Sequence, residues 1–381
     1  MKRRTFLGAA TVSLAATQLA RPAFAAGSTA GHYTVVARFW GAMPTGVTVS
    51  RHGRIFVNFP RWGDDVPFTV AELRGGKPVA YPNAEVNRQD ATDLAGHLQS
   101  VQSVVVDPAD RLWILDTGSP LFAGSSYGGP KLVAVDLHTN RIVRTILFPP
   151  EVVPANSYLN DVRFDLRRGA AGVAFITDSG GPNGIIVVDL ASGRSRRRLA
   201  GHPSVLPDPD FVPIIDGQPF MVRPAGGEPT SYETGSDGIA LSADGRYLYY
   251  CPLSGRRLHR VAADALADPH AIDADVAATV ENLGFKPMAD GLESDDKGRL
   301  YGGDLEHNAI WRRNPDGTYC TLAHGTDLNW IDTLSIASDR NLYATANQLD
   351  RLAPFHEGQD LRRKPYLLVR LPIDAGPVKL V

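Results

Sequence analysis

Short runs of alternating apolar and polar residues recur along the chain, a pattern typical of β-strands. These runs form a repeat with six copies. In five of them, a second strand-like run begins with a basic or polar residue, eight positions after the start of the first run. Gly, Asp or Pro residues separate the two runs, so each copy predicts a β-hairpin. The six copies begin at Gly46, Ser103, Asp161, Gly238, Gly291 and Thr333.

Two further strand-like runs follow some hairpins, as at residues 131–136 and 142–147. Four strands per copy predict an all-β fold, a six-bladed β-propeller with four-stranded antiparallel blades. Helical patterns are limited to residues 262–266 and 275–281, which we expect to be short connectors between outer strands. So few helices exclude a Rossmann fold or a TIM barrel. Because a ring needs its ends joined, we expect one of the flanking strands, 32–39 or 366–371, to complete the last blade.

The first 25 residues have the pattern of a cleaved export signal. Lys2, Arg3 and Arg4 precede the apolar stretch 6–20, and a small-residue site ends at Ala25. The paired arginines resemble a twin-arginine signal, which implies the Tat export machinery as a partner before cleavage. We therefore expect a periplasmic or extracellular protein whose residues 26–381 form one propeller domain.

Composition narrows the classes of function. The 381 residues include 37 Gly and 28 Pro, which indicates many tight turns, and 43% are hydrophobic. Outside the N-terminus no apolar run approaches the roughly 20 residues of a membrane span, and the net charge of −2 gives no basic excess for nucleic acid. Two cysteines, Cys251 and Cys320, are too few for a disulfide framework, and we interpret them as buried, unpaired thiols.

In a propeller, the residue before each inner strand lies at one mouth of the central channel. These residues are all polar, and three are carboxylates: Thr45, Gln102, Asn160, Asp237, Asp290 and Asp332. Because like charges repel strongly at low dielectric, such a group holds a cation, shares protons or lies in a water-filled mouth. Its oxygen-only donors favour calcium, with Asn160, Asp237 and Asp290 as ligands. Alternatively, these residues only form turns at strand starts.

The connection after each second strand reaches the same mouth and adds aromatic, acidic and imidazole groups. Such a mixture fits a small organic ligand with one or two polar handles. The expected ligand-binding residues are Arg61, Trp62, Gln102, Asp116, Asp178, Asp304, Asp332 and Asn347. Arg61 and Trp62 could equally form a surface stack. The longest irregular stretch, residues 207–235, is expected to cover the mouth as a lid.

Several longer motifs, at residues 53–62, 111–118, 237–242 and 246–254, resemble the Yellow and major royal jelly protein family. The resemblance runs from about residue 34 to about residue 350. It implies a six-bladed propeller, with dopachrome conversion in some members and binding of small amines in others. Cys251 stands where the family has a histidine.

A more distant resemblance is to the gluconolactonase and regucalcin propellers, which hold a metal with one Glu, two Asn and one Asp. Asn160 and Asp290 match this set by position, Asp237 replaces an Asn, and Thr45 stands in place of the Glu. The resemblance thus implies a calcium site in which one expected ligand is changed.

Three functions remain open, of which the third, a scaffold for protein interactions, would require an exposed apolar patch on the rim of the propeller. In the first, the mouth is catalytic: Asp237 or Asp290 acts as general base, Asn160 orients the substrate or metal, and His307 or Glu306 is the acid partner. The reaction is isomerisation of a dopachrome-like compound or hydrolysis of a lactone.

In the second, the mouth binds aromatic or amine ligands without chemistry. Zinc-protease, dithiol, P-loop and dinucleotide motifs are absent from the sequence.

Overall fold

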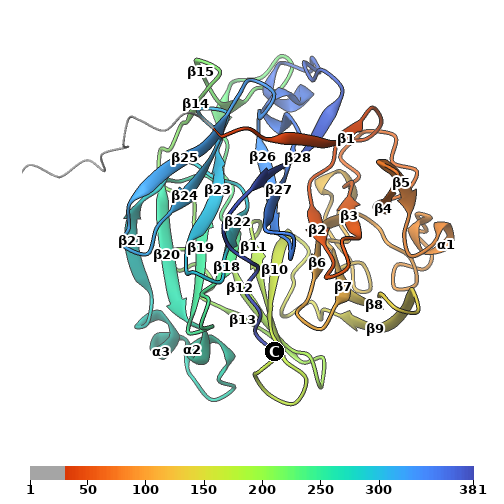
Figure 1. Ribbon diagram of the computed structural model, residues 1–381, viewed down its shortest axis with the longest axis vertical. Helices are drawn as coiled ribbons and strands as arrows, with labels where there is room; N and C mark the ends of the chain where they lie inside the picture. The colour runs from red at the N-terminus through yellow and green to blue at the C-terminus, as the bar shows by residue number, and fades with distance from the viewer. Residues whose placement is uncertain (1–30) are drawn as a thin grey trace, which may run out of the picture.

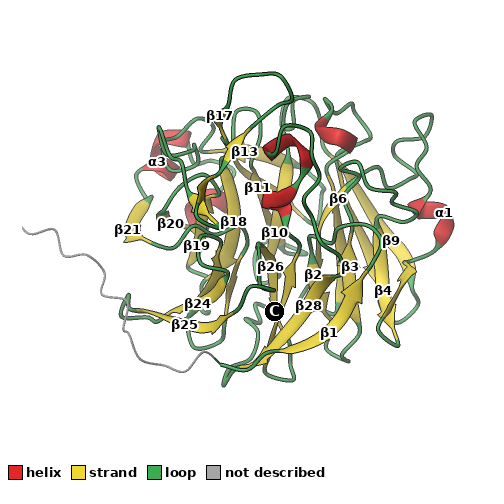
Figure 2. Ribbon diagram, turned by 90° about the horizontal axis from the view of Figure 1, so that it is seen from above, coloured by secondary structure: helices red, strands yellow, loops and turns green. Residues whose placement is uncertain are grey.

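The computed structural model describes residues 31–381 and confirms a six-bladed β-propeller. The predicted export signal, residues 1–25, lies outside the described residues. Each blade is a four-stranded antiparallel sheet. Figure 2 shows strands making up the body of the molecule, with only short helices beside them.

The first three blades follow one another along the chain. Blade 1 contains β2 (Val47–Val49), β3 (Ile55–Asn58), β4 (Val70–Arg74) and β5 (Lys77–Ala80). Blade 2 contains β6 (Val101–Val106), β7 (Arg111–Asp116), β8 (Lys131–Asp136) and β9 (Arg141–Leu147). Blade 3 contains β10 (Leu159–Asp165), β11 (Val173–Asp178), β12 (Gly184–Asp189) and β13 (Ser195–Arg198).

The last three blades complete the ring. Blade 4 contains β18 (Ser236–Leu241), β19 (Tyr247–Pro252), β20 (Arg257–Ala262) and β21 (Glu281–Phe285). Blade 5 contains β22 (Leu292–Ser294), β23 (Leu300–Asp304), β24 (Ala309–Arg313) and β25 (Tyr319–His324). Blade 6 contains β26 (Ile331–Ile336), β27 (Asn341–Ala346), β28 (Tyr366–Pro372) and β1 (Thr34–Phe39).

Both flanking strands complete blade 6, whereas the sequence led us to expect one. β28 follows β27 as the third strand, and β1 pairs with β28 in an antiparallel register from Thr34–Arg370 to Phe39–Tyr366. Figure 1 shows the N-terminal strand β1 in red alongside the C-terminal blade in blue. The ring is therefore closed by hydrogen bonds between the two ends of the chain.

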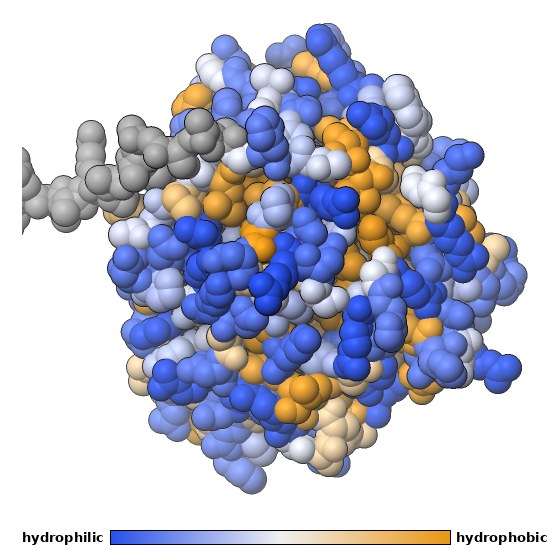
Figure 3. Space-filling model, viewed as in Figure 1, coloured by the Kyte–Doolittle hydropathy of each residue, from blue (hydrophilic) through white to orange (hydrophobic). Residues whose placement is uncertain are grey.

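The apolar core lies between the faces of neighbouring blades. Trp113 of blade 2, for example, stacks on Phe164 of blade 3 with ring centroids 5.1 Å apart. The inner strands crowd the axis: a Cβ at Gly238 would lie 2.4 Å from the carbonyl oxygen of Asp290. This close approach explains why Gly begins several of the sequence copies. Figure 3 shows hydrophilic residues predominating on the visible face, with smaller hydrophobic areas between them.

The helices of the described residues are all short. The two expected connectors are α2 (Ala263–Ala267) and α3 (Asp273–Ala277), between β20 and β21, and α1 (Ala84–Asn87) follows β5. Within residues 31–381, no helix has the length and apolar character needed to span a membrane. Cys251 and Cys320 are unpaired as expected, but Cys320 is only half-buried because it lies on the outermost strand β25.

The long irregular stretch between blades 3 and 4 contains two small hairpins, β14 (Ile214–Ile215) with β15 (Gln218–Pro219), and β16 (Met221–Val222) with β17 (Thr230–Ser231). The backbone N–H of Arg223 in this stretch donates a 2.8 Å hydrogen bond to the carbonyl of Pro354, which lies between β27 and β28. Phe220 packs on Phe355 with ring centroids 4.6 Å apart. The stretch thus forms a wall at the channel mouth.

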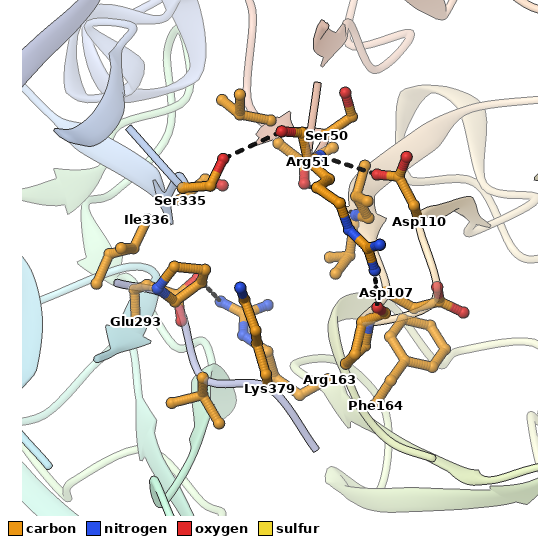
Figure 4. Close-up of a pocket in the computed structure, with 18 of the residues that line it drawn as sticks. Ser50, Arg51, Asp107, Asp110, Arg163, Phe164, Glu293, Ser335, Ile336 and Lys379 are labelled. Atoms are coloured by element: carbon orange, nitrogen blue, oxygen red, sulfur yellow. Dashed lines mark hydrogen bonds and ion pairs between the residues drawn. The ribbon is translucent and has the colours of Figure 1, made fainter. Parts of the chain in front are cut away.

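The opposite end of the channel is narrowed by the C-terminal tail. Pro377 bridges to Asp295, and Leu380 is buried while its carbonyl accepts a 2.9 Å hydrogen bond from Leu166. A cavity of about 130 Å³ remains there. In Figure 4, Lys379 extends into the middle of this opening, near Arg163. The cavity at the other mouth of the channel is larger than this one.

Candidate functional site

A cavity of about 630 Å³ lies at the mouth where the inner strands begin, and we call it the mouth cavity. Its floor is polar and its walls are mainly aromatic and apolar, a composition suited to a small organic ligand. Its floor residues are Gln102, Asn160, Asp237, Asp290 and Asp332. The aromatic wall residues are Trp62, Phe122, Tyr158, Tyr232 and Phe355.

Five of the six residues that the sequence placed before the inner strands line one cavity, and Thr45 does not. Gln102, Asn160, Asp237 and Asp332 are the second residues of β6, β10, β18 and β26, so they lie within the strands rather than before them. Thr45 is fully buried, and its hydroxyl accepts a 2.7 Å hydrogen bond from Asn58. The same Asn58 amide donates to the carbonyl of Gln102 at 3.0 Å. Thr45 and Asn58 thus join the first two blades behind the floor.

Asp237 and Asp290 form a carboxyl pair at the floor. Both are almost fully buried, and a hydrogen bond links their side chains. Asn160 Nδ2 donates to Asp237 Oδ2 at 2.7 Å, whereas Asp237 Oδ1 accepts no hydrogen bond from any other described residue. Trp330 Nε1 donates to Asp290 Oδ2 at 2.7 Å. Each carboxyl of the pair thus accepts a hydrogen bond from a neighbouring side chain.

The environment separates the proton affinities of these acids. Burial, followed by the negative charge of Asp290, raises the pKa of Asp237 well above its usual range. Burial also raises the pKa of Asp290, but hydrogen bonds from Asp237 and Trp330 favour its ionised form and hold the value at about 6. Of the two, Asp237 therefore binds a proton more readily and Asp290 is the more readily ionised.

Asp332 is the third acid of the floor. Its pKa is raised well above its usual range, first by burial and then by the charge of Asp290. Asn347, an expected ligand-binding residue, lies behind it and donates to Asp332 Oδ2 at 2.7 Å. Asn347 therefore positions a floor residue and does not itself line the cavity.

A chain of hydrogen bonds crosses the first aromatic wall. Trp62 Nε1 donates to the Tyr158 hydroxyl at 2.8 Å, and that hydroxyl donates to Gln102 Oε1 at 3.1 Å. Phe122 stacks on Trp62, with ring centroids 5.1 Å apart and an interplanar angle of 23°. On the second wall, Tyr232 and Phe355 meet edge to face at 5.5 Å.

Three of the expected ligand-binding residues are instead tied into the frame of the propeller. Arg61 donates to the backbone carbonyls of Gln99, Val66 and Asn87. Asp116 forms a buried ion pair with Lys131 at 2.8 Å, and Asp178 forms one with Arg197 at 2.6 Å. These three side chains lie outside the mouth cavity and stabilise the loops around it.

The expected acid partners also lie away from the cavity. The His307 side chain is exposed and contacts Asp304 at 2.9 Å. Glu306 pairs with Arg256 at 2.5 Å and accepts from the backbone of Ile214, so it anchors the stretch that contains β14. Neither residue lines the cavity with Asp237 and Asp290.

Sequence reasoning missed much of the aromatic wall. Phe122, Tyr158 and Phe355 lie in irregular segments without strand periodicity. Tyr158 could have been found by its position two residues before Asn160. Trp330 could have been found in the same way, because it lies two residues before Asp332.

The residues expected to hold calcium, Asn160, Asp237 and Asp290, do lie next to one another. One oxygen each of Asp237 and Asp290 already accepts a hydrogen bond, which leaves Asp237 Oδ1 as the buried oxygen without a donor. Within the described part of the chain, no group of three or more His, Cys, Asp or Glu side chains is arranged to hold a metal ion. Calcium binding stays a prediction.

Comparison with solved structures supports the fold. A luciferin-regenerating enzyme has a TM-score of 0.55 at 12% identity, covering 92% of this chain and 99% of that structure. A putative gluconolactonase has a TM-score of 0.54 at 11% identity, with coverage of 93% and 95%. The gluconolactonase XC5397 of Xanthomonas campestris has a TM-score of 0.51 at 13% identity, with coverage of 93% and 98%. At these identities, the likeness concerns the fold alone.

Sequence relatives indicate the family. Protein yellow of Drosophila melanogaster is 29% identical over 243 residues, which cover 60% of this chain and 42% of the relative. Protein yellow of Drosophila pseudoobscura pseudoobscura is 29% identical over 248 residues, with coverage of 61% and 42%. The chain thus spans about two fifths of the length of these relatives. The model of the major royal jelly protein family matches residues 99–367, well over half of the chain, so this chain belongs to that family.

Proposed function

We propose that this propeller acts on a small cyclic or aromatic metabolite in the mouth cavity by transferring a proton. The observation that carries the proposal is the Asp237–Asp290 pair, two buried carboxyls in contact on the floor of a cavity with aromatic walls. A pair whose pKa values are pushed apart supplies an acid and a base side by side. Such a pair suits isomerisation, in which the substrate loses one proton and gains another.

The proposed step conserves atoms and electrons. Asp290 takes a proton from a ring carbon, and the bonding electrons form a new C=C bond in the ring. A conjugated carbonyl oxygen takes the proton of Asp237 as its π electrons move onto that oxygen. The pair still holds one proton, and transfer across its internal hydrogen bond restores the starting state.

Two features favour isomerisation of a dopachrome-like compound over hydrolysis of a lactone. Some members of the major royal jelly family are linked to dopachrome conversion, whereas likeness to gluconolactonases extends only to the fold. In addition, Thr45 stands where the metal-binding Glu of those propellers is expected, and it is buried away from the cavity. Asn160 orients Asp237 in this scheme, and His307 and Glu306 take no part.

Binding without chemistry is the second candidate, and the aromatic walls favour it. Trp62, Phe122 and Tyr158 form a continuous ring surface with centroid separations of 5.1 to 6.5 Å. Such a surface can hold a flat or cationic ligand beside an acidic floor. Saturable binding without turnover would support this candidate over catalysis.

The test is to assay the purified protein on a dopachrome-like substrate and on lactones, with and without chelator. We expect isomerase activity that Asp290→Asn lowers about 100-fold or more, because the base is lost. Asp237→Asn should also lower kcat. Asp304, which the sequence placed among the ligand-binding residues, contacts His307 and lies outside the cavity. The matched change Asp304→Asn should therefore leave activity near that of the wild type. An activity that survives Asp290→Asn would contradict the assignment of the base.

A further inference from the structure

The hydrogen-bond chain on the first aromatic wall fixes the orientation of an amide. The Tyr158 hydroxyl receives the indole proton of Trp62 at 2.8 Å, so its own proton is free to go to Gln102 Oε1 at 3.1 Å. The oxygen of the Gln102 amide therefore faces the wall, and its nitrogen faces the other way. Gln102 is 4% exposed and lines the mouth cavity.

Within residues 31–381, the nitrogen of this amide has no acceptor. Among the hydrogen bonds of residues 31–381, Gln102 Nε2 donates to none, although Gln102 is almost fully buried. By contrast, Asn160 uses its amide nitrogen on Asp237 and on Ser179. Gln102 Nε2 is not sealed in the interior but is open to the mouth cavity, so its N–H groups are free to donate to a molecule bound there.

We propose that Gln102 determines specificity in the mouth cavity by donating a hydrogen bond to a neutral carbonyl oxygen on a flat ring. This inference rests on the proposed function in one respect, the binding of a ring compound in this cavity. The ring packs on Trp62 and Phe122, which are already stacked on each other. Trp62 and Tyr158 act through Gln102 and are positioning residues.

The charges of the floor favour a carbonyl over other polar groups. A carboxylate could accept from Gln102, but Asp237, Asp290 and Asp332 line the same floor and disfavour a further negative charge. An ammonium group could bind the acids, but it has no lone pair for Gln102. A neutral carbonyl oxygen satisfies Gln102 without placing another anion beside the acids.

A matched set of indoles tests the proposal by calorimetry with the full chain. We expect indole-3-carboxaldehyde, a ring with a carbonyl, to bind about tenfold more tightly than 3-methylindole, which lacks the acceptor. Indole-3-carboxylate and tryptamine should bind more weakly than the aldehyde. In Gln102→Met, which keeps the length of the side chain but has no N–H group, the aldehyde should lose this advantage while 3-methylindole binds as before.

Two further variants keep the test decisive if Gln102→Met does not fold. Tyr158→Phe and Trp62→Phe retain an aromatic ring but break the chain that orients Gln102, so the preference for the aldehyde should fall several-fold. Tyr127→Phe, the same change at an exposed tyrosine outside the cavity, should leave the preference intact.

The outcomes separate this inference from the proposed function. Equal affinity of the wild type for the aldehyde and 3-methylindole would overturn the role of Gln102 but leave ring binding, and with it the proposed function, in place. Tighter binding of the carboxylate or of tryptamine would also overturn it. If none of the four indoles binds, the role of Gln102 is overturned, while the proposed function is still decided by the isomerase assay and Asp290→Asn. Loss of the aldehyde preference in all three cavity variants, with 3-methylindole binding retained, would support it.

Discussion

Trp330 Nε1 donates a 2.7 Å hydrogen bond to Asp290 Oδ2, which links the entrance of blade 6 to that of blade 5. Trp330 directly precedes β26, and Asp290 lies two residues before β22. A hydrogen bond to the ionised form of a carboxyl lowers its pKa. In the proposed mechanism, Trp330 therefore helps to keep Asp290, rather than Asp237, as the base of the pair.

The first prediction follows from this contact. Trp330→Phe keeps an aromatic ring but removes the donor, so the pKa of Asp290 should rise above its value of about 6. The acid limb of the pH–activity profile should then shift to higher pH. Trp311→Phe is the control, because Trp311 Nε1 donates to the carbonyl of Gly303 in the core of blade 5. An unchanged profile in Trp330→Phe would show that the indole does not tune the base.

The second prediction concerns the dependence of stability on pH. Burial raises the folded-state pKa values of Asp237, Asp290 and Asp332 above the ordinary value of about 4. A raised pKa gives stability that is complete below pH 4 and is lost as pH rises through the folded value. For Asp290 this window is about pH 4 to 6, and for the other two it extends higher.

Thermal unfolding between pH 5 and pH 8 checks this sign. The contribution of the floor to stability should fall as pH rises, and Asp237→Asn should flatten the profile because its amide needs no proton. Asp210→Asn, a change at an exposed acid in the irregular stretch, should leave the profile unchanged. A steeper loss of stability at high pH in Asp237→Asn would contradict the assignment.

Much of the fold could be predicted because strands leave a period-two pattern and turns leave Gly, Asp and Pro. The same periodicity placed Gln102, Asn160 and Asp237 at one mouth, since each directly precedes a repeated strand start. Loop side chains carry no such period. Arg61 follows a strand as expected, yet three backbone carbonyls turn it away from the cavity. Which way a loop residue points depends on these partners, which spacing does not encode.

The third prediction concerns calcium. Any calcium bound by Asn160, Asp237 and Asp290 would compete with the proton that the carboxyl pair shares. Stabilisation by calcium should therefore be larger at pH 8 than at pH 5.5, and Asp237→Asn should reduce it. Thermal unfolding with calcium and then with chelator, at both pH values, measures the effect. A calcium-dependent shift that is equal at both pH values would place the ion elsewhere.

The last prediction tests whether Asp116 stabilises the fold or binds the ligand. The sequence placed this residue among the ligand-binding residues. Asp116 and Lys131 are almost fully buried, and their ion pair of 2.8 Å lies outside the mouth cavity. Asp116 also accepts backbone hydrogen bonds from Gln99 and Ser100 at 2.7 and 2.9 Å, so it holds the segment that leads into β6 and Gln102.

Removing one partner of such a pair leaves a buried charge without compensation. Lys131→Met should therefore lower the free energy of unfolding by about 3–5 kcal/mol. Asp116→Asn should also destabilise the protein, since it removes the charge opposite Lys131. Because neither side chain lines the cavity, the folded fraction of each variant should bind ring compounds with nearly wild-type affinity. Denaturant unfolding and calorimetry measure the two effects separately. Loss of affinity in Asp116→Asn with unchanged stability would instead restore Asp116 as a ligand-binding residue.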